Sequence, residues 1–550
     1  MEPGGVVKNQ RLPPPPADFP TTPNMQPDIV RDSYLAAVPS PNYCNNKTPV
    51  ECGLNIEAWR KYEHIVARTD PTLVDQLQFG FDMGIDESHD INIPVINHKS
   101  AKQDYQVIDQ FIIKHHKDGS LIGPFTKNPL PVVVKPSPMQ VVTSSSGKKR
   151  PVLDMSYPKG HSINDAITSD WNQIGGFEGE FRLPTHDDLC KIALTVDDPV
   201  MFVVDMKSYY MQLPSEWASA PLMALTWRGG LYIHRRLPFG CRSSCLHAQR
   251  VTDAVSNIYK EKTDNHVSGY VDDFGSIITL LRSFLAFQDF RDLVKELGLL
   301  ETLEKLMVPD KIRQFLGLLY NLAEMTLGLP DDKLSRTVIM LNDWLEKEEC
   351  SEKQVQSLLG HLNHVSTVVH AGRPFTCRFV DILKAKQFPA PVTEDIKQDI
   401  VTWIALLQGN FCHKSIIKSY DLVDPDVVLK VQVKAQTFVI WCNGEIIPCK
   451  IAETLPSLPT HAMYATAIWK ACCEYSAVFV GTVVKVTVPS KAAAMVINRA
   501  RTPCTHIRPM LRKMWAIQAT YDFIVRAVVG DNSVHGLYDN FHVFQDVFYV

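Results

Sequence analysis

Two adjacent acids interrupt an apolar run of this sequence. Residues 268–278 read Ser-Gly-Tyr-Val-Asp-Asp-Phe-Gly-Ser-Ile-Ile, with Asp272 and Asp273 at the centre. A second apolar run, residues 200–204, ends at Asp205. Both runs are typical of buried strands, in which carboxylates that lie close together repel one another unless a cation is present. The pattern therefore favours a fold in which the two strands are neighbours and a cation offsets the charge of the three acids.

A simpler explanation covers the adjacent pair alone, because Asp is common in turns and both acids could lie at a hairpin tip. The acid at the end of the second strand is what favours a metal site. Mg²⁺ prefers a few carboxylates, with substrate phosphates completing its shell, and two bridged ions clamp an in-line phosphoryl or nucleotidyl transfer. We therefore predict a magnesium site with Asp205, Asp272 and Asp273 as its ligands.

Composition narrows the class of protein. The chain has 550 residues, of which 45% are hydrophobic and 21% charged, an ordinary globular balance with room for more than one domain. The net charge of -4 means that any nucleic-acid surface has to be a local basic patch, such as residues 147–150. We find no signal peptide and no apolar run of the ~18 residues that a membrane helix needs. We expect an intracellular protein, cytoplasmic or nuclear, with reduced cysteines.

Hydrophobic periodicity and punctuation by Pro and Gly predict the local structure. The expected segments are a disordered Pro-rich tail at 1–54, an N-terminal helical extension at 55–119, a mixed region at 120–320, a helical region at 321–417 and an α/β unit at 418–550. Within them we expect helices at 55–68, 104–117, 243–262 and 282–300, a hairpin arm at 148–156, a hairpin around residues 228–230 and one strand over 268–278.

Several short motifs then occur in a fixed order. They are Val-Val-Asp-Met-Lys-Ser-Tyr-Tyr at 203–210, Leu-Pro-Phe-Gly at 237–240, Tyr-Val-Asp-Asp-Phe at 270–274 and Phe-Leu-Gly at 315–317. With flanking phrases such as residues 123–138 and 358–375, the stretch from about 120 to 385 resembles the reverse transcriptases of retroelements. It is most similar to those of DIRS-like retrotransposons, the type that carries a tyrosine recombinase. Several ordered motifs are far more specific than any one of them.

The resemblance implies an α+β right-hand polymerase, with fingers and a ferredoxin-like palm at 120–320 and a helical thumb and connection at 321–417. It implies RNA-directed DNA polymerase activity with two Mg²⁺ ions, for which Mn²⁺ could substitute. Asp205, Asp272 and Asp273 match the family's metal ligands. Lys305 matches a lysine that can protonate the departing pyrophosphate, which is reasonable chemistry for Lys, although a surface lysine explains this position nearly as well.

The resemblance also implies a nucleotide site. Tyr210 matches the aromatic residue that crowds a ribose 2′-hydroxyl and so selects deoxynucleotides, and the adjacent Tyr209 competes for this assignment. Phe239 and Gly240 belong to the element beneath the template–nucleotide pair, where a glycine allows close backbone approach.

Arg150 matches the arginine of the fingers that contacts the incoming triphosphate, for which a guanidinium fork is well suited. The neighbouring Lys148 and Lys149 could do the same or could lie in a solvated loop. The chain departs from the family after residues 237–240, where an Ala-Pro pair and a later Phe are replaced by Ser244, Cys245 and Ala248. It also departs at residues 144–149. These changes could reduce activity or fidelity, but they leave the three acids in place.

The α/β unit at 418–550 resembles a ribonuclease H-like domain, whose nuclease site also needs clustered carboxylates for two metals. The four positions where acids are expected hold Lys434, Tyr464, Pro489 and Leu537. Asp531 and Asp539 are close in sequence but out of register. We predict a ribonuclease H-like fold without nuclease activity.

The implied partners are an RNA or DNA template with its primer and deoxynucleoside triphosphates, without a membrane. Integration would need separate recombinase or capsid proteins. An alternative is a decayed or host-retained nucleic-acid-binding protein with little polymerase activity, and the lost acids and the changed residues 244–248 motivate it. An unrelated nucleotidyltransferase would explain the two acidic strands but not the flanking motifs.

Overall fold

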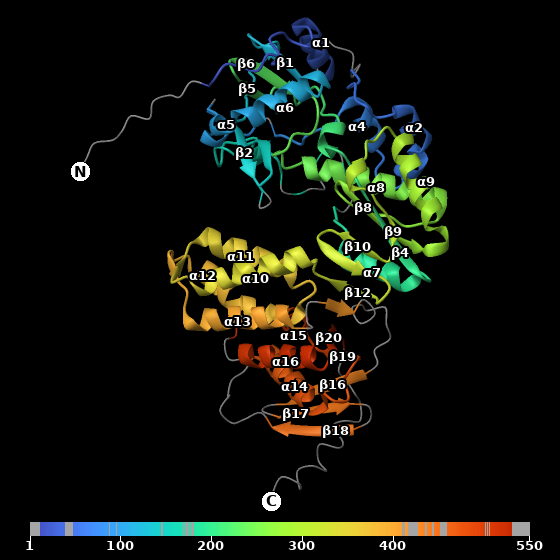
Figure 1. The fold of residues 1–550 in the computed structure, drawn as a ribbon, viewed down its shortest axis with the longest axis vertical. Helices are drawn as coiled ribbons and strands as arrows, with labels where there is room; N and C mark the ends of the chain where they lie inside the picture. The colour runs from blue at the N-terminus through green and yellow to red at the C-terminus, as the bar shows by residue number, and fades with distance from the viewer. Residues whose placement is uncertain are drawn as a thin grey trace, which may run out of the picture. The chain divides into compact units, whose positions relative to one another are not determined.

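The computed structural model shows two compact units, Met1–His186 with Val200–Asp310 and Asp187–Pro199 with Lys311–Val550 (Figure 1). The residues that it describes are 12–38, 48–86, 88–94, 96–144, 147–168, 170, 174, 177, 181–409, 413–415, 427–434, 437–442, 445–450, 459–500, 502, 504 and 507–530. Both units mix helices and sheets, which confirms the predicted α+β class.

The central sheet of the first unit has four strands in the order β7-β8-β4-β9. Their bounds are β4 Pro199–Asp205, β7 Ser268–Tyr270, β8 Asp273–Thr279 and β9 Met307–Asp310. Every residue of β4 is buried, as expected of a near-continuous apolar strand at the middle of a covered sheet. Helices α8 (Ser244–Thr263) and α9 (Ser283–Glu296) pack on the sheet, and rings from both layers meet where Phe290 contacts Phe202 and Phe274.

A second layer of strands lies in the same unit. One sheet has the order β1-β6-β5, from β1 Leu121–Phe125, β6 Gly230–His234 and β5 Ala224–Trp227, and β2 Met139–Thr143 pairs with β3 Lys149–Leu153. The predicted hairpin around residues 228–230 is confirmed, since Trp227 pairs with Gly230. Arg228 and Gly229 both have positive φ, 49° and 82°, as the tightest hairpin turns require.

Arg228 adopts this conformation while its side chain is held by Asp109. That carboxylate accepts hydrogen bonds from Arg228 Nε and Nη2, at 2.8 and 2.6 Å, and from Trp227 Nε1 at 2.8 Å. Asp109 is 1% exposed and lies on α6 (Tyr105–Lys117). A buried carboxylate with three donors ties the hairpin to the helix.

The helices expected at 104–117 and 243–262 are confirmed as α6 and α8, and the one expected at 282–300 ends earlier, at Glu296. The chain there turns through Gly298, whose φ is 76°. The helix expected at 55–68 is divided at Tyr62 into α2 (Ile56–Lys61) and α3 (Glu63–Val66). The remaining short helices of this region are α4 Leu73–Phe79 and α5 Lys99–Gln103.

The Pro-rich segment differs from the disordered tail expected at 1–54. Pro27–Ala37 forms helix α1, with Val30 fully buried and Tyr34 8% exposed. The side chain of Asn24 donates to the carbonyl of Leu121 at 3.0 Å. Proline in the first turn suits a helix start, and the apolar pair at i, i+4 packs onto the body of the unit. The prediction of disorder was wrong for residues 27–37, because it rested on proline content and did not consider the apolar residues of this segment.

The second unit begins with antiparallel strands and helices. Its first sheet has the order β10-β11-β12-β15. The elements are α7 His186–Thr195, whose first residue belongs to the other unit, β10 Ile312–Phe315, β11 Leu318–Asn321, β12 Thr326–Gly328, α10 Asp331–Leu345, β13 Glu349–Cys350, α11 Glu352–Val365, η6 His370–Thr376, α12 Cys377–Ala385, β14 Ala390–Pro391, α13 Glu394–Gln408 and β15 His413–Ser415. Phe315 pairs with Leu318, so the Phe-Leu-Gly motif makes a tight hairpin turn.

The rest of this unit is an α/β fold built on a five-stranded sheet in the order β18-β17-β16-β19-β20. The strands are β16 Val427–Lys434, β17 Thr437–Cys442, β18 Glu445–Lys450, β19 Val483–Val488 and β20 Ile524–Val529, and the helices are α14 Thr460–Tyr475, α15 Lys491–Arg499 and α16 Arg508–Thr520. The first three strands in sequence are antiparallel neighbours, whereas β16, β19 and β20 run parallel. The α/β unit expected after residue 417 is therefore present.

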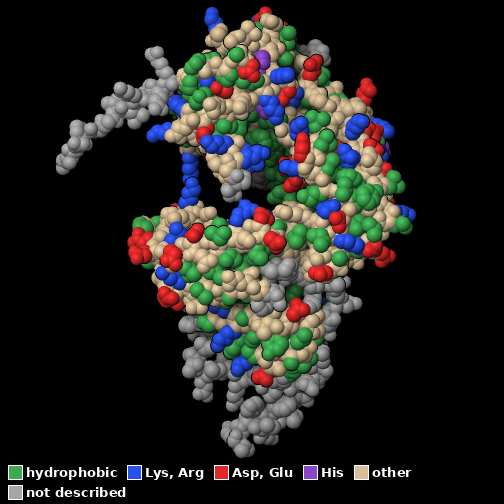
Figure 2. Space-filling model, in the orientation of Figure 1, with side chains coloured by type: hydrophobic (Ala, Val, Ile, Leu, Met, Phe, Trp, Pro, Cys, Tyr) green, Lys and Arg blue, Asp and Glu red, His purple; other side chains and the backbone are tan. Residues whose placement is uncertain are grey.

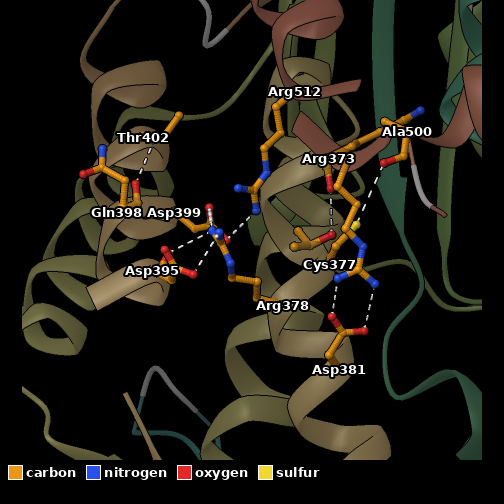
Figure 3. A network of polar contacts seen from close by, with 12 residues as sticks. Arg373, Cys377, Arg378, Asp381, Asp395, Gln398, Asp399, Thr402, Ala500 and Arg512 are labelled. Carbon is orange, nitrogen blue, oxygen red and sulfur yellow. Dashed lines mark hydrogen bonds and ion pairs between the residues drawn. The ribbon is translucent and has the colours of Figure 1, made fainter. Parts of the chain in front are cut away.

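Ion pairs join this α/β fold to the helices before it (Figure 3). Asp399 on α13 is 1% exposed and accepts from Arg378 Nη1 at 2.6 Å and from Arg512 Nη2, on α16, at 2.9 Å. Arg508 holds Asp381 through two nitrogens, at 2.5 and 3.1 Å. Because Asp399 on α13 receives charge-assisted bonds from α12 and α16, and Asp381 on α12 receives them from Arg508 on α16, these ion pairs fix the three helices to one another.

Among the described helices, none combines the length and apolarity that crossing a membrane requires. The described cysteines form no disulfide. Figure 2 shows acidic and basic side chains interspersed over the face that it draws.

Replacing Asp399 by Asn should lower the free energy of unfolding of the second unit by about 3 kcal/mol, because it leaves two arginines without their buried counter-charge. Asp395→Asn is the matched control, because Asp395 pairs with the same Arg378 but has a side chain that is 76% exposed. This variant should change the free energy of unfolding by less than about 0.5 kcal/mol. Urea unfolding of the full chain, followed by tryptophan fluorescence, measures both. Equal effects of the two variants would contradict the role of the buried pair.

Candidate active site

The acids at 272–273 lie at the tip of a hairpin. The single strand expected over 268–278 is instead two antiparallel strands, β7 and β8, in which Tyr270 pairs with Asp273 across a turn formed by Val271 and Asp272. This corrects the sequence prediction. Gly269 allows β7 to pack closely on α8, because a Cβ there would lie 2.1 Å from the Thr252 side chain. The tip is partly buried, so the acids are at a turn but do not lie freely in solvent.

Val271 occupies a backbone conformation that β-branched residues avoid. Its φ is 54°, and such strain persists only where the surroundings over-determine it. Helix α8 provides that restraint. The Val271 N–H donates to Gln249 Oε1 at 2.8 Å, and its carbonyl accepts from Thr252 Oγ1 at 2.5 Å.

Sequence reasoning missed Gln249 and Thr252. Both are fully buried, and they lie three positions apart on one face of α8, where residues at that spacing are neighbours. Gln249 also donates to the carbonyl of Gly269 at 2.9 Å. Two polar residues on the buried face of an amphipathic helix are the signal that could have identified them, because buried polar groups need partners.

Asp205 ends the strand beside this hairpin. β8 and β4 are neighbours in the sheet, and the Met206 N–H donates to the Asp272 carbonyl at 2.8 Å. The Asp205 carbonyl accepts from the Thr302 N–H at 2.7 Å. The Asp205 and Asp273 carboxyls are within hydrogen-bonding reach of each other. The sheet thus brings the three predicted acids together.

Burial and mutual repulsion perturb these carboxyls. Burial, with the charges of Asp272 and Asp205, raises the pKa of Asp273 to about 7. Burial, followed by the charge of Asp205, also raises the pKa of Asp272. Both causes disfavour the ionised form. An arrangement of this kind is incomplete without positive charge.

Lys305 provides part of that charge. Its Nζ lies 2.7 Å from Asp205 Oδ2, and this contact raises the pKa of the lysine. The charge of Lys305 also offsets part of the rise in the pKa of Asp272 and Asp273. The residue belongs to a single 3₁₀ turn, Leu303–Lys305, and its side chain reaches the acids.

The basic residues of β3 differ in their surroundings. Lys149 is ion-paired with Asp104. Arg150 is exposed on the strand. Its positive charge opposes the rise in the pKa of Asp272 that burial causes. Of these two side chains, Arg150 is therefore the one whose field reaches the acids.

The structure separates the two adjacent tyrosines. Tyr209 is 2% exposed, and its hydroxyl lies 3.0 Å from Thr252 Oγ1, so it belongs to the support of the hairpin. Tyr210 is partly buried, and its ring centroid lies 5.0 Å from that of Phe239, at an interplanar angle of 59°. Burial, followed by the charge of the neighbouring Cys245, raises the pKa of Tyr210.

Gly240 joins the Leu-Pro-Phe-Gly segment to β3. Its φ is 112°, and a Cβ there would lie 1.9 Å from the Leu153 carbonyl oxygen. The Leu153 N–H donates to the Phe239 carbonyl at 3.2 Å, and Asn164 Nδ2 donates to the Gly240 carbonyl at 2.8 Å. Phe239 is 40% exposed. Only glycine allows this approach, which places the segment against the strand that carries Arg150.

The donor set of this site consists of carboxylate oxygens. In the part of the chain that the structure describes, no three or more His, Cys, Asp and Glu side chains are arranged around a common metal position, and Asp205 is paired with Lys305. Mg²⁺ commonly uses only one or two carboxylates, with substrate phosphates completing its shell. The oxygen donors fit such an ion, and a dication would reverse the raised pKa values of Asp272 and Asp273.

The positions where the C-terminal unit was expected to lack acids are only partly described. Lys434 is the last residue of β16. Tyr464 is 6% exposed on α14, and Pro489 is exposed directly after β19. Leu537, Asp531 and Asp539 lie outside the described residues. Loss of nuclease activity therefore stays a prediction.

Comparison with known proteins gives the family of the segment that contains Asp205, Asp272 and Asp273. The family model for reverse transcriptase (RNA-dependent DNA polymerase) matches residues 135–319. The chain contains a reverse transcriptase domain. This segment includes Arg150, Asp205, Tyr210, the hairpin acids and Lys305, and the domain is an RNA-directed DNA polymerase.

The search of curated proteins finds no match. Among solved structures, the chain is similar to foamy viral protease-reverse transcriptases. One, a dRH form with double-stranded DNA, has 16% identity and a TM-score of 0.47, with 86% of this chain and 82% of that chain covered. Another, a complex with double-stranded DNA, has 17% identity and a TM-score of 0.46, and the match covers 88% of this chain and 95% of that chain. A third, a complex with an RNA/DNA hybrid, has 16% identity and a TM-score of 0.47, and the match covers 88% of this chain and 62% of that chain.

Replacing Gln249 by Leu in the reverse transcriptase domain should lower the free energy of unfolding by about 1–3 kcal/mol, because it leaves backbone groups of Gly269 and Val271 unpaired. It should also slow primer extension at least about tenfold, since the acids lose their fixed turn. Gln288→Leu is the matched control. Like Gln249 it bonds to an Asp four residues later, but on the exposed side of α9, and it should change neither quantity. Full extension by Gln249→Leu would refute the bracing role.

Proposed function

We propose that this chain is the reverse transcriptase of a retroelement and that it extends a primer on an RNA template by two-metal nucleotidyl transfer. Asp205, Asp272 and Asp273 would hold the metals. The observation that carries the proposal is that Asp205, at the end of β4, lies beside the hairpin tip that carries Asp272 and Asp273 at raised pKa, inside the segment that matches the family. Carboxylates so arranged are ready to accept dications.

The reacting groups would be positioned by the side chains around these acids. Bound Mg²⁺ would lower the pKa of the primer 3′-hydroxyl and offset the charge of the triphosphate. Arg150, exposed and within the field of Asp272, would grip phosphate oxygens through its guanidinium fork. Lys305 carries its proton beside Asp205 and would pass it to the departing pyrophosphate.

Sugar selection would fall to Tyr210. Its ring is packed against Phe239, so it cannot move away from a 2′-hydroxyl without losing that contact. Selection by clash needs such a rigid wall. Tyr209 is occupied within the core, which favours Tyr210 for this role.

The motifs favour an element of the DIRS-like type, with recombinase or capsid functions on separate proteins. The alternative of a decayed nucleic-acid-binding protein rests on the changed residues after the Leu-Pro-Phe-Gly segment. Ser244 and Ala248 are nonetheless fully accommodated in the core, at 1% and 0% exposure, and Ser244 Oγ donates to the Pro238 carbonyl at 3.0 Å. Substitutions that pack and bond in this way favour a working polymerase.

Primer extension on an RNA template tests the polymerase site. The double variant Asp272→Asn with Asp273→Asn should lose activity by about a thousandfold or more, because the carboxylates that hold the metals are gone. Asp187→Asn with Asp188→Asn, another adjacent acidic pair, on the first turn of α7, should retain activity. Activity that survives in the 272–273 variant would overturn the site. An inactive parent chain that still binds primer–template would establish the binding-protein alternative.

We also expect no cleavage of the RNA strand in an RNA–DNA hybrid. The C-terminal unit holds Lys434, Tyr464 and Pro489 where a nuclease would need carboxylates, and lysine or proline cannot ligate Mg²⁺ in their place. The full chain carrying the 272–273 substitutions is incubated with end-labelled hybrid and Mg²⁺ or Mn²⁺, beside an active ribonuclease H in the same buffer. Divalent-dependent cleavage by the variant would refute the prediction.

A further inference from the structure

The segment 300–305 carries Lys305 past the acids without a buried side chain of its own. The structure describes all of its residues, and each is exposed or half-buried. Leu300 and Leu303 are 59% and 63% exposed, and the side chain of Lys305 is 62% exposed. A segment with so few apolar contacts is held weakly by packing. The place of the lysine therefore depends on the hydrogen bonds of this segment.

The backbone of the segment pairs with the chain at the end of β4. The Lys207 N–H donates to the Leu300 carbonyl at 2.8 Å. The Thr302 N–H donates to the Asp205 carbonyl at 2.7 Å. An isolated antiparallel bridge lies between these two bonds. A pairing this short is only marginally stable by itself, so it needs further support.

The carboxamide of Gln212 provides that support at the start of the segment. Its Oε1 accepts from the Leu300 N–H at 2.7 Å, and its Nε2 donates to the carbonyls of Leu300 and Lys207 at 3.0 and 2.7 Å. Gln212 thus bonds both backbone groups of Leu300, as an opposite residue of an antiparallel strand does. It is the last residue of the 3₁₀ turn Tyr209–Gln212, which fixes it to the chain that follows Asp205.

A second anchor lies on the other side of the segment. Arg291, on α9, donates through Nε to both carboxylate oxygens of Glu301, at 3.0 and 3.1 Å. Loss of the Gln212 bonds would therefore loosen the segment without detaching it. Lys305, whose Nζ lies 2.7 Å from Asp205 Oδ2, would lose its fixed place while the acids keep theirs.

We propose that Gln212 is a positioning residue for Lys305, which it keeps beside the acids by fixing the start of the segment that carries the lysine. The inference rests on the proposed role of Lys305 as proton donor. In that step the bond between the α-phosphorus and the bridging oxygen breaks, and the oxygen keeps the electron pair and takes a proton from the ammonium. The amine then regains a proton from water. Misplacement of the donor slows this step and leaves nucleotide binding unchanged.

The test is single-turnover extension of a primer by one nucleotide, with purified full-length protein and saturating Mg²⁺. Gln212→Met keeps the length of the side chain and removes its three hydrogen bonds. It should lower the maximal rate about tenfold, with little change in the nucleotide concentration that gives half of that rate. Gln288→Met is the matched control, since Gln288 bonds only within α9 on its exposed side, and it should change neither quantity. An unchanged rate in Gln212→Met would overturn the proposal.

A double-mutant cycle shows whether the loss passes through the lysine. Lys305→Met alone should slow the reaction about a hundredfold, the usual contribution of a general acid. Adding Gln212→Met to Lys305→Met should cost nothing further. Losses that multiply would overturn the proposal, because Gln212 would then act on the acids or on the fold. Gln212→Glu keeps the acceptor for the Leu300 N–H and replaces Gln212→Met in the cycle if the latter does not fold.

The leaving group provides a readout that a merely structural role would not change. A deoxynucleotide with a difluoromethylene bridge between the β- and γ-phosphorus releases a less basic oxygen than one with a methylene bridge, and so needs the proton less. The rate loss in Gln212→Met should be several-fold smaller with the difluoromethylene analogue. Equal losses with the two analogues would contradict a role through Lys305.

Lys305→Met separates failure of this inference from failure of the function on which it rests. If Lys305→Met slows extension and Gln212→Met does not, only the positioning role fails. If Lys305→Met leaves the rate unchanged, the proposed proton donor is wrong, and the positioning role is wrong with it. A parent chain without extension activity would contradict the proposed function itself.

Discussion

The hold of α8 on the backbone of Val271 is the interaction on which the polymerase site depends. A β-branched residue at positive φ is an unfavourable conformation for an isolated hairpin, and two fully buried side chains, Gln249 and Thr252, bond its N–H and carbonyl. On the same helix, Thr252 Oγ1 lies 3.0 Å from the hydroxyl of Tyr209, the residue before Tyr210. One helix thus contacts both the hairpin that carries two of the acids and the turn that carries the two tyrosines. Anything that shifted α8 would move these two elements together.

Much of the fold could be predicted from the sequence wherever periodicity was long and clear. Helices α6 and α8 and the hairpin at Trp227–Gly230 followed from pattern and turn chemistry. The positive φ of Val271 could not be predicted in this way, because the turn lacks the Gly or Asn that usually marks positive φ. Its strain is compensated by tertiary bonds from a distant helix, which no local pattern records. The helix α1 was missed for a related reason, since the surface that buries Val30 is built from other parts of the chain.

The candidate site shows the same division. The ordered motifs identified Asp205 and the hairpin acids, and the structure brings them together. The residues that hold the turn, Gln249 and Thr252, belong to no motif that the sequence offered. Cys245 stood out only as a difference from the family pattern. Residue identity also could not decide between Tyr209 and Tyr210, whereas burial does: one ring belongs to the core and the other faces Phe239. Acids at strand ends thus indicate the kind of reaction from sequence alone. The side chains that position those acids become visible only in the folded structure.

The contact between Lys305 and Asp205 has a consequence for how the protein is made. Because an ammonium on the chain already compensates one of the clustered carboxylates, the hairpin can fold before any divalent ion arrives. A dication held by Asp205 would replace one counter-charge with another, and the Lys305 ammonium would then be free for another partner. Folding of this region and occupation of the proposed metal site would in this way be separate events, and a newly synthesised chain would not need to compete for metal to become stable.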